Sequence, residues 1–334
     1  MNPRKRPAID IIFVLVILGM LVYPAWGRLE DLDTFDKNFG GRKQLVKIVN
    51  NFRYHKLGER LFNRVLRGDE DWLVYTDENN LDDYQNSIPF SEQELALIQQ
   101  KIDNLRANLE AQGIRFYVII PPNKETIYPE RVPVEVPILG SESRLGQLVA
   151  YLERNGGTQI IDLRPALRDA RTQNQVYFRT DTHWNRMGAY VAYQETASIL
   201  SADFPAIVPH PLEDFELEVK PFSGDLSLIA GELSLSEESE FLNPRFSGEV
   251  TRSETVENDT RYLITENPHP DLPRAVIFRD SFFESVIPLL SNHFSRSVNA
   301  WNFTYDPALV ERESPDLVIY ECTERYLKFL LQLP

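Results

Sequence analysis

Continuous apolar runs separated by helical patterns constrain the fold of this chain more than any other feature of its sequence. Runs such as Phe116–Ile120 contain no polar residue, as is typical of strands buried on both faces of a parallel sheet. Helical patterns lie between them, and strands that alternate with helices indicate a mainly parallel sheet covered on both faces. The strands are expected near 72–75, 116–120, 159–162, 274–279, 297–301 and 317–321, and the helices at 91–112, 143–154, 186–200 and 281–291, with a last one through Leu331.

The amino-terminal segment predicts a membrane anchor. Arg4, Lys5 and Arg6 precede an uncharged run over 11–27, and acidic residues follow it. This asymmetry is typical of a segment inserted with its amino terminus in the cytoplasm, and the run approaches the roughly 20 residues that span a bilayer. We expect an uncleaved single-pass anchor in a bacterial cytoplasmic membrane with the bulk of the chain extracytoplasmic; cleavage after Ala25-Trp26-Gly27 is the alternative.

Charge and cysteine content exclude several functions. The net charge of −15 argues against nucleic acid as a partner, because a phosphate backbone is bound by clustered Lys and Arg. Cys322 is the single cysteine of the chain, so it forms no internal disulfide and builds no cysteine-based zinc cage. Its position after an apolar run predicts a buried residue at the end of a strand. No metal and no cofactor are expected.

Ser281 follows Asp280 where an apolar strand gives way to a predicted helix. Ligands of open α/β sheets bind at the carboxyl ends of the strands, and a helix amino terminus supplies unpaired N–H groups that stabilise an oxyanion. Asp and Ser are also the commonest helix caps, so this position alone does not distinguish a nucleophile from a cap.

The segment Thr180-Asp181-Thr182-His183 supplies a base and a carboxylate. Side chains two apart in an extended segment point the same way, so Asp181 can orient His183, which in turn can face Ser281. An incidental surface histidine, or half of a metal site, are the alternatives, although no further His or Cys lies at ligand spacing.

With these two blocks, the sequence resembles the SGNH hydrolase-like domains of the alginate O-acetyltransferase (AlgJ/AlgX-type) family. The resemblance extends from about Trp72 to Leu327, and in it, as here, Asp-x-His precedes the serine. It implies a three-layer α/β/α sandwich after a transmembrane anchor, with Ser281 as nucleophile, His183 as general base and Asp181 as its orienting partner. It further implies a polysaccharide acceptor and a membrane-bound O-acyltransferase as the partner that supplies acetyl. The acidic insert around 232–257 departs from the family pattern.

The expected organisation is a cytoplasmic tail and anchor (1–28), a helical stalk or peripheral helix (29–67) and the acetyltransferase domain (68–334). An acetyl esterase of the same fold and a non-catalytic glycan-binding scaffold remain alternative functions. Five residues are candidates for substrate binding: Lys124, Tyr128, Trp184, Arg279 and Trp301. For Tyr128, Arg279 and Trp301, packing in the core or at the rim is the stronger alternative.

Overall fold

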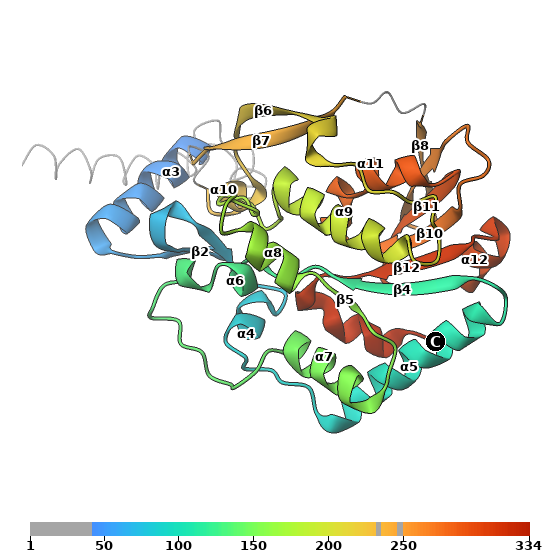
Figure 1. Cartoon of the computed structure of the whole chain (residues 1–334). Helices are drawn as coiled ribbons and strands as arrows, with labels where there is room; N and C mark the ends of the chain where they lie inside the picture. Colours follow the sequence, from blue (N-terminus) through green and yellow to red (C-terminus); the bar gives the residue numbers. More distant parts are fainter. Residues whose placement is uncertain (1–41, 232–234, 246–249) are drawn as a thin grey trace, which may run out of the picture.

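The computed structural model describes residues 42–231, 235–245 and 250–334. Its centre is a seven-stranded sheet in the order β5-β4-β12-β10-β11-β9-β8 (Figure 1). The first five of these strands run parallel to one another, and β9 and β8 extend the sheet antiparallel. The strands are β4 (Arg115–Ile120), β5 (Ile161–Asp162), β8 (Thr251–Glu257), β9 (Thr260–Glu266), β10 (Arg274–Arg279), β11 (Arg296–Trp301) and β12 (Leu317–Glu321).

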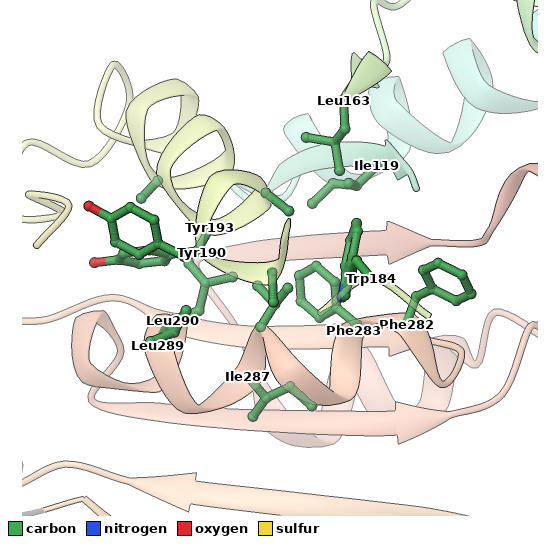
Figure 2. Packing of buried hydrophobic residues seen from close by; sticks show 14 of the residues in the cluster. Ile119, Leu163, Trp184, Tyr190, Tyr193, Phe282, Phe283, Ile287, Leu289 and Leu290 are labelled. Atoms are coloured by element: carbon green, nitrogen blue, oxygen red, sulfur yellow. The ribbon is translucent and has the colours of Figure 1, made fainter. Parts of the chain in front are cut away.

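Helices cover both faces of this sheet, which makes the three-layer sandwich that the sequence predicts (Figure 1). Successive strand residues point to opposite faces: Ile277 belongs to one core, while its neighbours Val276 and Phe278 belong to the other. On the Ile277 face, Trp184, Phe282 and Phe283 pack beside Ile119 (Figure 2). The helices are α4 (Asn80–Tyr84), α5 (Glu92–Glu110), α6 (Lys124–Ile127), α7 (Arg144–Asn155), α8 (Arg164–Ala170), α9 (Arg186–Leu200), α11 (Ile287–Leu290) and α12 (Pro307–Glu313).

Local signals set the ends of the longer helices. Ser91 caps α5 through a capping box with Glu94, and Ser143 caps α7 by accepting the N–H of Gly146. The expected helices at 91–112, 143–154 and 186–200 are confirmed within two residues. Cys322 is fully buried directly after β12, as expected.

The predicted helix over 281–291 is wrong as a continuous element. The segment is instead a 3-10 turn η5 (Phe282–Ser285), the short helix α11 and a second 3-10 turn η6 (Ser291–His293). Pro288 explains part of the break, because it has no N–H to donate to the carbonyl four residues earlier. The carboxy-terminal segment is likewise a 3-10 element, η7 (Glu324–Gln332).

The acidic stretch before β9 forms structure that the sequence analysis did not predict. β6 (Phe215–Phe222) and β7 (Glu237–Pro244) pair antiparallel outside the main sheet, and α10 (Asp225–Ile229) lies between them in the chain. The remaining short elements are η2 (Asp69–Asp71), η3 (Pro129–Arg131) and η4 (Leu212–Asp214).

A helical stalk or peripheral helix is expected over 29–67, of which residues 29–41 lie outside the described residues and 42–67 are helical only in part. α3 (Arg42–Phe52) continues into a π-helical turn η1 (Arg53–Leu57), and β1 (Leu61–Phe62), β2 (Val65–Arg67) and β3 (Leu73–Tyr75) then form a small antiparallel sheet. The predicted anchor lies outside the described residues. Within the described residues no helix is long and apolar enough to cross a bilayer.

A buried histidine in the Ile277-face core makes stability depend on pH. His293 is 5% exposed, and its Nε2 lies 2.7 Å from the Tyr193 hydroxyl, which also accepts the backbone N–H of His210. Burial, with a smaller effect of His210, lowers the pKa of His293 to about 4.

We expect the free energy of unfolding to fall as pH drops from 6.5 towards 4. An unfolded histidine binds its proton near pH 6.5, so the unfolded state takes up protons first and stability is lost across this window. Between pH 7 and 5 the loss from His293 is about 2 kcal/mol. A His293→Gln chain should lose correspondingly less than the wild type in denaturant titrations at both pH values. Identical pH slopes for the two chains would contradict the assignment.

Candidate active site

The structure brings together the two predicted blocks, although they are far apart in the chain. His183 Nε2 lies 2.8 Å from Ser281 Oγ, and His183 Nδ1 lies 2.6 Å from Asp181 Oδ1. With Nδ1–H donating to Asp181, Nε2 is left to accept the hydroxyl proton of Ser281. Burial tends to raise the pKa of Asp181, but the hydrogen bonds and charge of His183 outweigh it and lower that pKa to about 2. Asp181 is therefore ionised at neutral pH.

A buried lysine holds the loop that carries Asp181 and His183. Lys124, in the first turn after β4, donates from Nζ to the carbonyl oxygens of Phe178, Arg179 and Asp181 at 3.3, 3.4 and 2.6 Å. It is 3% exposed, and burial lowers its pKa. Three carbonyls pointing at one cation fix the direction of the backbone at the base of the loop.

Glu237, the first residue of β7, holds the same loop from its N–H side. Its carboxylate accepts the backbone N–H groups of Arg179 and Thr180 at 3.0 and 2.9 Å and the Thr180 hydroxyl at 2.9 Å. The Glu237 side chain is almost fully buried. The β6–β7 pair is therefore joined to the loop that carries Asp181 and His183.

A second carboxylate, Asp225, stands behind the Asp181–His183 pair. The Asp225 N–H donates to Asp181 Oδ2 at 2.9 Å, and its carboxylate accepts the N–H and hydroxyl of Thr182, both at 3.0 Å. Burial, then the charge of Asp181, raises the pKa of Asp225. Gly224, the residue before Asp225, packs tightly against the same loop. A Cβ added to it would lie 2.4 Å from the Asp181 Cβ and 2.4 Å from the Thr180 carbonyl oxygen.

Ser281 is positioned by its neighbour Asp280 at the carboxyl end of β10. Asp280 Oδ1 accepts the Phe282 N–H at 2.8 Å, and Oδ2 accepts the N–H and hydroxyl of Thr323 at 2.8 and 2.6 Å. The Asp280 N–H donates to Glu321 at the end of β12. Because η5 has only four residues, no long helix begins after Ser281 as predicted, and side chains at the ends of β10 and β12 position the serine instead.

A cavity of about 270 Å³ opens at Ser281. Aromatic rings form much of its wall, and Arg186 and Glu284 bring charge. Among the residues of the wall are Trp184 and Trp301, two of the five substrate-binding candidates. The lining comprises Phe178, Asp181, His183, Trp184, Arg186, Phe222, Phe241, Ser281, Glu284, Ser285 and Trp301.

The other three candidates lie behind this surface. Lys124 supports the loop, and Tyr128 is buried against the Trp72 ring with its hydroxyl accepting the Val176 N–H. Arg279 is fully buried, with its guanidinium 4.7 Å from the Trp301 ring and Nη1 2.7 Å from Glu284. Lys124 and Arg279 thus contact residues of the cavity wall, whereas the residues that Tyr128 contacts do not line the cavity. The Trp184 Nε1–H donates to Ser285, and Trp301 is 40% exposed.

The described residues contain a group with metal-ligand spacing, which the sequence analysis found only in part. The ligand atoms of Asp181, His183 and Asp225 lie within 4.8 Å of one another. Asp225 was missed because it is 44 residues from Asp181 in the chain. An ion bound to His183 Nδ1 would displace the hydrogen bond to Asp181, so the arrangement seen here is that of a hydrogen-bonded array.

Comparisons with known proteins agree with this fold. A mainly parallel sheet covered by helices on both faces is the architecture expected of an SGNH hydrolase-like α/β protein. The family model described as the SGNH hydrolase-like domain of the acetyltransferase AlgX matches residues 65–273, more than half of the chain. The chain belongs to this family.

Similar curated sequences carry the name probable alginate O-acetylase AlgJ. The chain is 30% identical over 281 residues to that of Pseudomonas syringae pv. tomato, covering 82% of this chain and 65% of the relative. It is 29% identical over 283 residues to that of Pseudomonas fluorescens, covering 82% and 64%. The chain thus spans less than two thirds of the length of these relatives. Among solved structures, Bacillus cereus PatB1 shares the fold, with a TM-score of 0.60 at 14% identity over 81% of this chain and 99% of that one.

We expect Gly224→Ala to slow the reaction of Ser281 with a fluorophosphonate probe by about 10²-fold, because the new methyl group displaces Asp181 and with it His183. Gly146→Ala is the matched control, since its methyl group meets the exposed, flexible side chain of Glu142. Labelling rates measured beside thermal melts separate displacement of the loop from unfolding. Equal labelling of both variants at wild-type rate would show that the loop tolerates the methyl group.

Proposed function

We propose that this chain is a polysaccharide O-acetyltransferase that works through an acetyl ester on Ser281. The observation that carries the proposal is the 2.8 Å contact of Ser281 Oγ with a histidine already oriented by an ionised aspartate. Membership of the AlgX-type family and the name of the AlgJ relatives support acetyl transfer as the reaction.

The reaction has two steps that use the same residues. Ser281 Oγ attacks the carbonyl carbon of an acetyl donor while His183 Nε2 takes the hydroxyl proton, which then passes to the leaving group. A sugar hydroxyl next attacks the acetyl-Ser281 ester, His183 accepts its proton, and that proton returns to Ser281 as the ester bond breaks. Asp181 stabilises the imidazolium formed in each step.

The backbone N–H of Ser281 is the donor best placed for the oxyanion of both steps. It makes no hydrogen bond to any residue in the described ranges, whereas the next N–H, of Phe282, donates to Asp280. An N–H on the nucleophile itself lies next to the carbonyl oxygen of a bound acetyl group, where negative charge develops.

The cavity wall suits an anionic sugar polymer of the alginate type. Trp301 and the phenyl rings provide faces on which sugar rings can stack, and Arg186 provides a cation. No hydrogen bond or ion pair joins Arg186 to a side chain in the parts that the structure describes, and its guanidinium lies 5.8 Å from the Phe241 ring. Burial lowers its pKa, yet a guanidinium stays protonated at neutral pH. A uronate carboxylate would satisfy it.

We infer the place of this reaction from the amino-terminal sequence. The basic residues before the uncharged run over 11–27 support a single-pass anchor with the catalytic domain outside the cytoplasmic membrane. A membrane-bound O-acyltransferase that delivers acetyl to that side is the donor partner we propose.

Replacing Ser281 with alanine tests the nucleophile. Acetyl transfer from a small acetyl ester to polysaccharide should fall about 10³-fold or more, because the acetyl-enzyme can no longer form. Mass spectrometry of the wild type mixed with donor alone should locate acetyl on Ser281, and the exposed Ser87→Ala should behave as the wild type. Undiminished transfer by Ser281→Ala would end the proposal. Product that is only free acetate, with acceptor in excess, would favour the esterase instead.

Arg186→Ala tests the acceptor. We expect its KM for a polyuronate to rise about tenfold or more, as for loss of a charge-assisted hydrogen bond, while acetylation of Ser281 by the small donor is unchanged. A neutral glucan offered in parallel should show no difference between wild type and variant. Equal KM values for the polyuronate would show that Arg186 does not bind the acceptor.

A further inference from the structure

The α3–η1 helix carries an exposed apolar surface on its outer side. Ile48, Phe52 and Leu57 are 65, 56 and 60% exposed, and Val49 and Leu61 beside them are 46 and 54% exposed. Residues 48, 49 and 52 share one side of a helix, at spacings of three and four. Four of these large apolar side chains are on α3–η1 and Leu61 is on β1, which is more than the scattered exposed leucine of an ordinary surface.

The opposite side of α3 is fixed to the rest of the domain. The Asn50 side-chain amide donates to the Ala230 carbonyl oxygen, and Val46 packs against Gly231, both directly after α10. In Figure 1, α3 accordingly lies beside α10 at an outer edge of the molecule, away from α5 and α12. The exposed apolar side chains therefore belong to a docked helix with a defined outward face.

Charge distinguishes this segment from the remainder of the chain. Residues 42–58 contain five Lys or Arg and no Asp or Glu, although the chain as a whole has a net charge of −15. Lys56 is exposed beside Leu57, and Lys47 is half-buried on the helix flank. An anionic surface would attract this segment and repel the acidic remainder, so the charge distribution selects one orientation as well as one partner.

We propose that α3–η1 is an interfacial helix that lies on an anionic lipid membrane and fixes the orientation of the catalytic domain. Apolar side chains facing outward with basic residues around them are the composition of helices that bury one side at the level of the lipid head groups. The helix contacts the end of α10, whose first residue, Asp225, hydrogen-bonds to Asp181. Membrane contact through α3 thus holds the Ser281 cavity at a set position relative to the lipid surface.

The experiment uses the full chain reconstituted into vesicles with an environment-sensitive fluorophore on Phe52→Cys or, as the matched control, on Val208→Cys. Val208 is 66% exposed and lies after α9, while the native Cys322 is fully buried. One set of vesicles is phosphatidylcholine, and the other contains about one quarter phosphatidylglycerol. We expect the Phe52→Cys probe to shift to the blue and to be quenched by lipids carrying a nitroxide on the acyl chain, in the anionic vesicles only. The Val208→Cys probe should change in neither.

A charge variant completes the test. Lys47→Gln with Lys56→Gln should remove the quenching in anionic vesicles while hydrolysis of a soluble acetyl ester is unchanged, which separates this inference from the proposed chemistry. Equal quenching in pure phosphatidylcholine, or quenching that survives the double substitution, would overturn the proposal. So would a Phe52→Cys probe already shielded from an aqueous quencher in detergent, because another part of the chain would then cover the helix.

Discussion

The buried ion pairs and hydrogen bonds around residues 178–183 are the constraint on which the candidate site depends. Lys124 takes the carbonyls of this loop and Glu237 takes its N–H groups, so the polar backbone is satisfied from both sides without regular secondary structure. An unsatisfied buried charge is costly, so each of these side chains is stable only with the loop in place. The loop, Lys124 and Glu237 therefore form one cooperative unit, and this unit fixes the position of the His183 imidazole.

A continuous series of contacts joins the candidate site to α3 at the edge of the molecule. α3 packs on the end of α10, α10 begins at Asp225, and Asp225 donates to the carboxylate that orients His183. Every link in this series is a buried or half-buried contact between described residues. The surface helix α3 and the hydrogen-bonded array of Asp181, His183 and Ser281 are thus separated by a single short helix, so the position of α3 relative to the cavity is fixed by direct contacts.

The sequence was sufficient to predict the five parallel strands of the main sheet and the longer helices, because these depend on local signals, whereas β8 and β9 were not predicted. The Ser281, His183, Asp181 set was predicted from the resemblance to the alginate O-acetyltransferase family, since neither block alone distinguishes a catalytic residue from a helix cap or a surface histidine. Apolar runs mark buried strands, Ser91 and Ser143 mark helix starts, and an Asp-x-His spacing places a carboxylate beside an imidazole. Asp225 and Glu237 depend on partners 43 to 58 residues away, and nothing local separates a buried acid from the many exposed ones around it. Lys124 was found by its place at a strand end, but only the folded chain reveals that it points at the loop. The broken helix after Ser281 was not predicted either, because an apolar pattern at helical spacing does not distinguish 3-10 geometry from an α-helix.

The β6–β7 hairpin stands outside the seven-stranded sheet and yet supplies Phe222 and Phe241 to the wall of the cavity. Its outward residues, such as Leu217 and Val219, are half exposed and contribute little to either core. Substitutions along β6 and β7 can reshape the wall of the cavity while Glu237, at the first position of β7, keeps the loop over 178–183 in place. Divergence in these two strands can therefore change which molecules the cavity admits without changing the Ser281, His183 and Asp181 array.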